Sequence, residues 1–448
     1  MSILKQQLPP LLKLAIPAAG AQLSIMLLGI VDTIMVGRLS VQALAASSIA
    51  NAWLYALLWS GMGLIQGIDP LVSQAHGAGR QDHASRALQR GIVLAIVISV
   101  PVICLLLSTQ HILLWFRQDA TLVTLASTYL TLQLWSVPAF FLFIAFRQYL
   151  QGREIVQPML WIAVIANVVN FIGNYGLIFG HFGFPELGLE GAAIASAVTR
   201  AFMFIALLAW CLRFKLIEGV WLPIQREVYR LKEFVKIIQV GLPVATQIGL
   251  EILAFSCGTF IAGRLGELSL AAHTVALNIA SVSFMIPLGI SQGAATRVGN
   301  LIGAHHYRQA NHAAWVAIVA GGAMMIISAV IFLVFKEQLP RFFSVDASLI
   351  QAAAYILPIA AAFQVFDGIQ VVCSGVLRGM GKPLPSTLAN LFAFWVIGLP
   401  VGYWLSIEKE FGLSGLWWSL SLGLALVAVI LMGWIALRGP EKYARHFE

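Results

Sequence analysis

Apolar runs recur along the whole chain and are separated by short polar connections. Each run is long enough to cross the hydrocarbon core of a bilayer as a helix, which takes about 20 apolar residues. The first run continues through residue 37, beyond the length of a signal-peptide core, so we expect it to be retained. The pattern predicts an all-α integral membrane protein with twelve transmembrane helices, over 13–37, 44–68, 87–112, 122–146, 158–180, 188–212, 238–262, 270–296, 312–335, 349–374, 385–406 and 412–437.

The composition agrees with this prediction and also orients the chain. Of the 448 residues, 60% are hydrophobic and 10% are charged, whereas soluble domains carry roughly 25% charged residues. Connections on the side of the N-terminus hold 20 Lys and Arg residues, and those on the opposite side hold 6. The positive-inside rule therefore predicts that both termini are cytoplasmic. It also accounts for the net charge of +8, so we expect no nucleic-acid partner.

The longest cytoplasmic connection divides the predicted helices into two sets of six. It covers residues 214–236, where apolar and basic residues alternate with a roughly helical period. Such a segment can lie along the membrane surface. We therefore predict an N-terminal six-helix bundle over 1–213, a cytoplasmic linker over 214–236 and a C-terminal six-helix bundle over 237–448.

The two halves repeat the same sequence pattern at a nearly constant shift. The stretch that begins at Pro17 matches the one that begins at Pro243, and Gly37-Arg38-Leu39 returns as Gly263-Arg264-Leu265 at the same shift of 226. Six helices per half is an even number, so both halves enter the membrane from the same side. Parallel repeats of this kind hold substrate at the interface between the halves and work by alternating access.

Three carboxylates lie deep within predicted helices, at Asp32, Glu251 and Asp367. Acids are expensive inside a membrane, so each is a candidate functional residue. A buried carboxylate can be neutralised by a proton, or by Na⁺ where neighbouring oxygens complete the site. In the repeat Asp32 aligns with Gly258, and Glu251 aligns with Ile25, seven residues before Asp32. The acids therefore share a helix face at depths roughly 10 Å apart, and the two halves differ in charge.

Several motifs in both halves resemble the multidrug and toxic compound extrusion (MATE) family, and within it the NorM-type branch. They are VDTIMVGRLSVQALAA, GIDPLVSQAHGAGR, LQGREIVQPML, GLEILAFSCGTFIAGRLG and the segment from Phe366-Asp367-Gly368 to VLRGMGKP. The resemblance implies two six-helix bundles arranged as a V around a central cavity. It also implies export of cationic and amphipathic organic compounds, including drugs, from the cell in exchange for Na⁺ or H⁺. The expected location is the plasma membrane, the inner membrane in bacteria.

The resemblance also assigns roles to the membrane acids. Glu251 and Asp367 match the cation site of the C-terminal bundle, so we expect them to bind Na⁺. Asp32 matches the acid of the N-terminal bundle, and its polar neighbours correspond to Asn170, Asn174 and Ser196. The alternative for the two asparagines, four residues apart on one helix face, is that they only bind helices together. By the same analogy, Pro17 kinks the first helix.

A drug cavity lined by aromatic and methionine side chains is a further expectation. Aromatic faces attract organic cations and methionine adapts to varied shapes, which points to Trp53, Tyr55, Phe284 and Met285. Packing against lipid would explain the same residues. Three other polar residues have no assigned role in transport: Asp69 suits a local turn or cap, His273 is structural or titratable, and Arg200 is placed mid-helix with Glu190 or Asp69 as possible partners.

Other classes of protein are disfavoured. A lipid-linked precursor flippase of the same wider superfamily predicts a more basic cavity than the first, second, seventh and eighth helices provide. An intramembrane enzyme needs a motif such as HExxH, which no predicted helix contains, or a serine paired with a histidine, and no such pair stands out in the sequence. The four cysteines stand singly in apolar runs, without the spacing of a disulfide framework or a zinc site. We therefore expect a monomeric antiporter in the bilayer, not an enzyme, with no cofactor other than its coupling ion.

Overall fold

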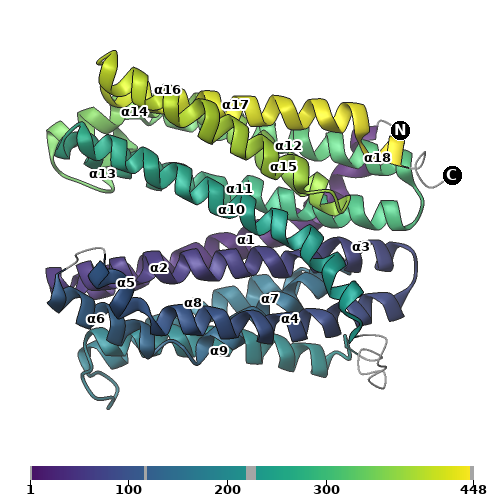
Figure 1. The fold of residues 1–448 in the computed structure, drawn as a ribbon, viewed down its shortest axis with the longest axis horizontal. Helices are drawn as coiled ribbons and strands as arrows, with labels where there is room; N and C mark the ends of the chain where they lie inside the picture. The colour runs from purple at the N-terminus through teal and green to yellow at the C-terminus, as the bar shows by residue number, and fades with distance from the viewer. Residues whose placement is uncertain (1–2, 116–118, 218–228, 444–448) are drawn as a thin grey trace. The chain divides into compact units, whose positions relative to one another are not determined.

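The computed structural model describes residues 3–115, 119–217 and 229–443, and within these ranges it contains helices and no strand (Figure 1). The first half holds α1 (Ile3–Gly37), α2 (Val41–Ile65), η1 (Gln66–Ile68), α3 (Asp69–Gly77), α4 (Gln81–Leu107), α5 (Thr109–Trp115), α6 (Ala120–Thr131), α7 (Ser136–Gly152), α8 (Gln157–Phe179) and α9 (Leu189–Arg213). The second half holds α10 (Leu231–Arg264), α11 (Glu267–Gly303), α12 (Tyr307–Val334), α13 (Gln338–Arg341), α14 (Ala347–Gly379), α15 (Leu384–Asn390), η3 (Leu391–Gly398), α16 (Leu399–Tyr403), η4 (Trp404–Glu408), α17 (Gly412–Arg438) and α18 (Pro440–Tyr443).

The described residues contain eleven helices that are long and apolar enough to cross a membrane, or twelve when the bent pair of α6 and α7 counts as one span. This confirms the predicted all-α membrane fold. Many helices extend beyond the predicted ends, as in α11, because hydropathy detects the membrane core whereas the helix continues into its polar flanks. The helix predicted over 87–112 is instead two, since α4 ends at Leu107 and α5 follows.

The span predicted over 122–146 is broken between α6 and α7, which meet at an angle of 54°. Residues 132–135 form turns closed by short backbone hydrogen bonds, such as Ser136 N to Gln133 O at 3.0 Å. Pro138 stands in the first turn of α7. Its ring clashes with the carbonyl of the residue four positions earlier in a regular helix, so a single straight helix through this segment is disfavoured.

The described residues form two compact units that do not coincide with the predicted domains 1–213 and 237–448. One unit comprises residues 1–22, 73–79 and 246–448, and the other comprises residues 23–72 and 80–245. The reason lies in α1 and α10, two helices of 35 and 34 residues. Each is longer than one membrane crossing requires, and each divides between the units. The predicted linker over 214–236 lies partly outside the described residues, because 218–228 are not described.

The same capping device begins α6 in one unit and α14 in the other. Asp119 accepts hydrogen bonds from the backbone N–H groups of Thr121 and Leu122, and Asp346 does so from Ser348 and Leu349. The N–H of Leu122 lowers the pKa of Asp119, and the hydroxyl of Ser348 lowers that of Asp346. The two caps are 227 residues apart, so the internal repeat extends to this detail of structure.

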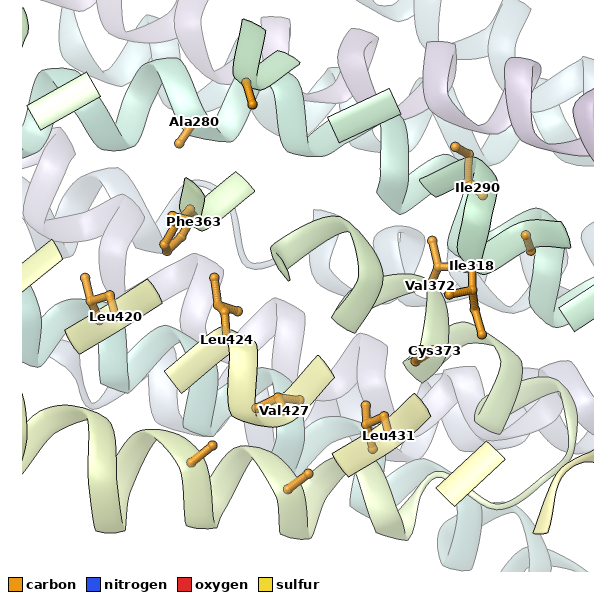
Figure 2. Packing of buried hydrophobic residues seen from close by; sticks show 14 of the residues in the cluster. Ala280, Ile290, Ile318, Phe363, Val372, Cys373, Leu420, Leu424, Val427 and Leu431 are labelled. Atoms are coloured by element: carbon orange, nitrogen blue, oxygen red, sulfur yellow. The ribbon is translucent and has the colours of Figure 1, made fainter. Parts of the chain in front are cut away.

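An apolar cluster fills the interior of the unit that contains α14 and α17 (Figure 2). On α17 its members follow a spacing of four, three and four residues, which gathers them on one helix face: Leu420, Leu424, Val427 and Leu431. Phe363 and Val372 of α14 belong to the same cluster. Because lipid tails are as apolar as leucine, this core is held by close packing, and dispersion replaces the hydrophobic effect as the main attraction.

Small residues bring α11 and α14 into backbone contact. Gly375 and Gly379 form a GxxxG pair on α14, and a Cβ at either position would collide with α11, at Ser291 and at Ala295. The hydroxyl of Ser291 also donates to the Val371 carbonyl at 2.7 Å. The acid-bearing segment of α14 is therefore fixed at close range against α11.

We expect Gly379→Ala to destabilise the folded protein. The new methyl group would meet the Ala295 carbonyl and its neighbouring backbone atoms, which cannot rotate away. Overpacking of this kind costs about 1–3 kcal/mol, measurable as a lower thermal unfolding temperature in detergent. The control is Gly433→Ala in α17, where a Cβ meets nothing within 4 Å. Equal unfolding temperatures for the two variants would contradict the close contact.

Candidate functional site

Asp32 lies at the centre of a polar cluster built from α1, α8 and α9. The amides of Asn170 and Asn174 donate to its Oδ1 at 3.0 and 2.5 Å, and the hydroxyl of Ser196 donates to its Oδ2 at 2.7 Å. Asp32 itself is 7% exposed. The structure thus brings together all four residues that the sequence predicted for this site.

The cluster follows from helical spacing. Asn170 and Asn174 are one turn apart on α8, and a further hydrogen bond of 3.2 Å from Asn174 to Asn170 aligns their amides. The Asn174 amide thus donates to two oxygens, that of Asp32 and that of Asn170, while Asn170 donates to Asp32. The Oδ1 of Asn174 is buried and has no hydrogen-bond partner among the described residues. This oxygen is free to help hold a cation beside Asp32.

A second acidic site lies in the other unit, where α10 meets α14. Asp367 is 6% exposed, Glu251 is half-buried, and the two carboxyl groups are close enough to interact electrostatically. The side chain of Gln370 lies beside Glu251. The oxygen of that amide has no hydrogen-bond partner in the described ranges. Two carboxylates and an unpaired amide oxygen form the donor set that hard cations such as Na⁺ prefer.

No group of three or more His, Cys, Asp and Glu side chains that could hold a metal ion occurs in the part of the chain that the structure describes. Gln370 is an addition to the pair of acids that the sequence reasoning missed. Its position three residues after Asp367, on the same helix face, is a signal that could have identified it.

A wall of aromatic rings adjoins the second site, and sequence reasoning missed it too. Phe363, one helical turn before Asp367, packs edge-on against Trp417 with ring centroids 5.5 Å apart. Trp417 in turn contacts His273, whose Nε2 is 3.3 Å from the hydroxyl of Thr259. His273 is fully buried on α11. It therefore belongs to the packed interior.

The residues predicted to line a drug cavity fall into two separate pairs. Trp53 and Tyr55 belong to one unit, where Tyr55 stacks on Trp59, and Phe284 and Met285 belong to the other. All four are half-buried, and their role stays a prediction. Pro17 lies inside α1. Asp69 is fully buried in the first turn of α3, where a carboxylate complements the helix dipole.

Arg200 has partners other than the two suggested acids, Glu190 and Asp69. Its guanidinium donates to the Oε1 of Gln133 at 2.8 Å and to the hydroxyl of Ser136 at 3.2 Å. The partners stand at the break between α6 and α7, so neither hydropathy nor spacing along the chain could have indicated them.

Comparison with known proteins agrees with this architecture. A sequence model of the MatE family matches residues 17–176 and 243–404, one segment in each half. The chain belongs to the MatE family. It is similar to the multidrug resistance protein NorM of Burkholderia vietnamiensis, with 34% identity over 94% of this chain and 92% of the relative. The NorM protein of Vibrio cholerae is 33% identical over 95% of this chain and 94% of its own.

Solved MATE structures have the same fold. The crystal structure of the eukaryotic MATE transporter AtDTX14 superposes with a TM-score of 0.90, at 23% identity, and covers 99% of both chains. The MatE assignment confirms the family predicted from the motifs. It also makes the chain a multi-pass membrane protein and a transporter, not an enzyme.

A double-mutant cycle tests the hydrogen bond between Asp32 and Asn174. Asn174→Ala removes a donor from a buried carboxylate, which costs roughly 1–3 kcal/mol, whereas the same change in an Asp32→Asn background costs less. We expect a coupling free energy on the order of 1 kcal/mol between the two positions in thermal unfolding at neutral pH.

Asn167 on the same helix provides the matched control. Its amide donates to the carbonyls of Ser24 and Ala163 and not to Asp32, so Asn167→Ala and Asp32→Asn should be additive. If Asn174→Ala and Asp32→Asn were also additive, the hydrogen bond between Asp32 and Asn174 would contribute nothing measurable to the free energy of unfolding.

Proposed function

We propose that this chain is a secondary multidrug exporter that moves cationic and amphipathic organic compounds out of the cell in exchange for Na⁺ or H⁺. It works by alternating access in the plasma membrane, the inner membrane in bacteria, with both termini in the cytoplasm. The names of the NorM relatives support the drug substrates, and the distribution of Lys and Arg supports the orientation.

One observation carries the proposal. Asp32, Glu251 and Asp367 lie inside membrane-spanning helices, and among the described residues none of them forms an ion pair with Lys, Arg or His. Charge in a medium of low dielectric must be balanced or removed. Acids that have no fixed positively charged partner suit a mobile cation, which binds and then leaves.

The two acidic sites favour different ions. At Asp32 both carboxylate oxygens already accept hydrogen bonds from Asn170, Asn174 and Ser196, so only a proton or a single cation can be added. At Glu251 and Asp367 two carboxylates share one region with the unpaired oxygen of Gln370. Two carboxylates and an amide oxygen in one region support Na⁺ binding there.

Exchange follows from competition for negative charge. A carboxylate that holds Na⁺ or a proton no longer attracts an organic cation, and one that has released its ion attracts it again. Binding of the coupling ion on one side of the membrane therefore promotes release of the drug on that side. Neutralisation also lowers the cost of moving the acid through the apolar interior, which permits the change of access.

Efflux from proteoliposomes tests the proposal and the role of Glu251 and Asp367. We expect an inward Na⁺ or pH gradient to drive export of a fluorescent organic cation. Glu251→Gln and Asp367→Asn should each reduce Na⁺-driven efflux at least tenfold, because the amide cannot replace the charge that holds the ion. Transport under each gradient is measured separately, with internal fluorescence as the readout.

Glu267→Gln is the control, since Glu267 is an exposed residue at the start of α11 and its loss should leave efflux unchanged. The antiporter proposal is wrong if neither gradient drives efflux by the unmodified protein. If both acid variants kept full Na⁺-dependent efflux, Glu251 and Asp367 would not be the Na⁺ site. The proposal that the protein is an exporter would still hold.

A further inference from the structure

A polar pocket opens at one end of the unit that contains α14. Its volume is about 560 Å³, and none of the three membrane acids lines it. Its walls come from the start of α1, from the beginning of α12 with the turn before it, and from α18, which lies beside α12 (Figure 1). These segments are at the ends of helices long enough to span a membrane. The pocket therefore lies at the level of the lipid headgroups, on the cytoplasmic side in the orientation proposed above.

The lining is rich in groups that donate hydrogen bonds. Three of its residues are histidines, at His305, His306 and His312. The Nδ1 of His305 is 2.9 Å from the hydroxyl of Tyr307, and the two rings meet edge-on with centroids 5.9 Å apart. An imidazole offers at least one N–H donor in either charge state. The pocket can therefore bind an acceptor such as a phosphate without depending on the charge of its histidines.

Two side chains of the lining carry opposite formal charges, Arg308 in the first turn of α12 and Glu441 in α18. Within the described part of the chain they form no ion pair with each other, and Arg308 forms none with any other residue. Both are exposed. The planar guanidinium suits two-pronged binding of a phosphate. Each charge is thus available to a ligand that enters the pocket.

Asn311 fixes the position of the carboxylate relative to the arginine. Its amide nitrogen donates to the Oε2 of Glu441 at 3.3 Å. A Cβ added to Gly439, at the end of α17, would lie 3.3 Å from the amide oxygen of the same asparagine. Asn311 stands three residues after Arg308, on the same face of α12 and about 4.5 Å further along its axis. The carboxylate is therefore held roughly one helical turn from the cation.

This arrangement indicates the charge of the ligand. A headgroup that carries only negative charge would meet repulsion from Glu441, and an organic cation would meet repulsion from Arg308. A zwitterion with a phosphate at one end and an ammonium at the other satisfies both side chains, because each of its charges forms a charge-assisted hydrogen bond. The short separation along α12 favours a short spacer between the two ligand charges.

We propose that this pocket binds the headgroup of phosphatidylethanolamine, in which two carbons join a phosphate to a primary ammonium group. Arg308 and the neighbouring imidazoles bind the phosphate, and Glu441 accepts hydrogen bonds from the ammonium. A quaternary ammonium has no N–H to donate, so the pocket discriminates against phosphatidylcholine. The ligand is a lipid and not a free solute because the pocket lies at the ends of membrane spans, where the acyl chains extend into the bilayer.

A bound headgroup has a structural consequence for the C-terminal end of the chain. It bridges the first turn of α12 and α18, which in the described structure are joined by the hydrogen bond between Asn311 and Glu441. A ligand that binds only the folded state stabilises that state. The lipid therefore fastens α18 to α12. Only the choice of leaflet rests on the proposed orientation, and the site itself does not depend on the exporter function.

The test is lipid retention by the purified full-length protein, measured by native mass spectrometry. Phosphatidylethanolamine, phosphatidylcholine and phosphatidylglycerol with identical acyl chains are added in turn. We expect phosphatidylethanolamine to bind about tenfold more tightly than the other two, because it alone satisfies both charges. Arg308→Gln should weaken the binding of phosphatidylethanolamine and phosphatidylglycerol alike. Glu441→Gln should weaken only that of phosphatidylethanolamine, which removes the preference between them.

Arg341→Gln is the matched control, since Arg341 is an exposed cation of the same unit in α13 and does not line the pocket. It should leave all three affinities unchanged. The unfolding temperature of each variant without added lipid shows that it is folded. Because Arg308 and Glu441 are both exposed, their substitution removes no packed side chain, and each variant tests one end of the headgroup independently of the other.

Three results would overturn the proposal. Equal retention of the three lipids, unaffected by either substitution, would show that the pocket binds no headgroup. Tighter binding of phosphatidylglycerol that does not respond to Glu441→Gln would show a site for anionic lipid. Displacement of the lipid by soluble glycerophosphoethanolamine at the same concentration would show a site for a free solute. Retention is measured without transport, so absence of efflux would contradict the exporter proposal alone.

Discussion

The cost of burying charge in a medium of low dielectric governs this structure. Most of each helix meets lipid or other apolar side chains, and there dispersion and close backbone contact are sufficient. The charged groups Asp32 and Arg200 in the interior instead form hydrogen bonds with specific polar neighbours. Asp32 receives three uncharged donors, and Arg200 receives two uncharged acceptors. Uncharged partners stabilise a charge without cancelling it, so it remains available to a mobile ion.

Duplication supplied the scaffold, and later divergence supplied the chemistry. The caps Asp119 and Asp346 keep the same position and hydrogen-bond pattern in both halves. The interior does not: the place of Asp32 is taken by Gly258, and leucines Leu416 and Leu420 lie where a side chain there would extend. Conversely, Glu251 aligns with Ile25. Each half thus has an acid where the other has an apolar residue, and a symmetric fold carries two unlike sites.

The sequence was sufficient for features that repeat along a helix. Hydropathy located the spans, spacing put Asn170 and Asn174 on one face, and the resemblance added Ser196. It was insufficient where contacts join distant segments or where a helix departs from regularity. The partners of Arg200 lie more than sixty residues away on the far side of a break, and Gln370 matters only because α14 packs beside α10. The unit boundaries also differ from the sequence boundary, since hydropathy does not show which bundle the ends of α1 and α10 join.

Irregular backbone accompanies the acid sites in both units. In one unit the break between α6 and α7 lies beside Tyr129 and receives Arg200. In the other, the span over 384–408 winds partly as π-helix, in η3 and η4.

Two local features accompany the π-winding. Pro400 removes a backbone donor within that span, and the indole of Trp395 in η3 donates to the carbonyl of Leu250, directly before Glu251. Within a membrane such irregularity is tolerated only where protein or water covers the backbone, because lipid offers no hydrogen bonds. π-Turns also concentrate at functional positions. The helix that carries Glu251 is therefore hydrogen-bonded to a segment whose backbone already departs from the regular α-helix, so a change in charge at Glu251 acts next to backbone that has less regular helical structure to lose.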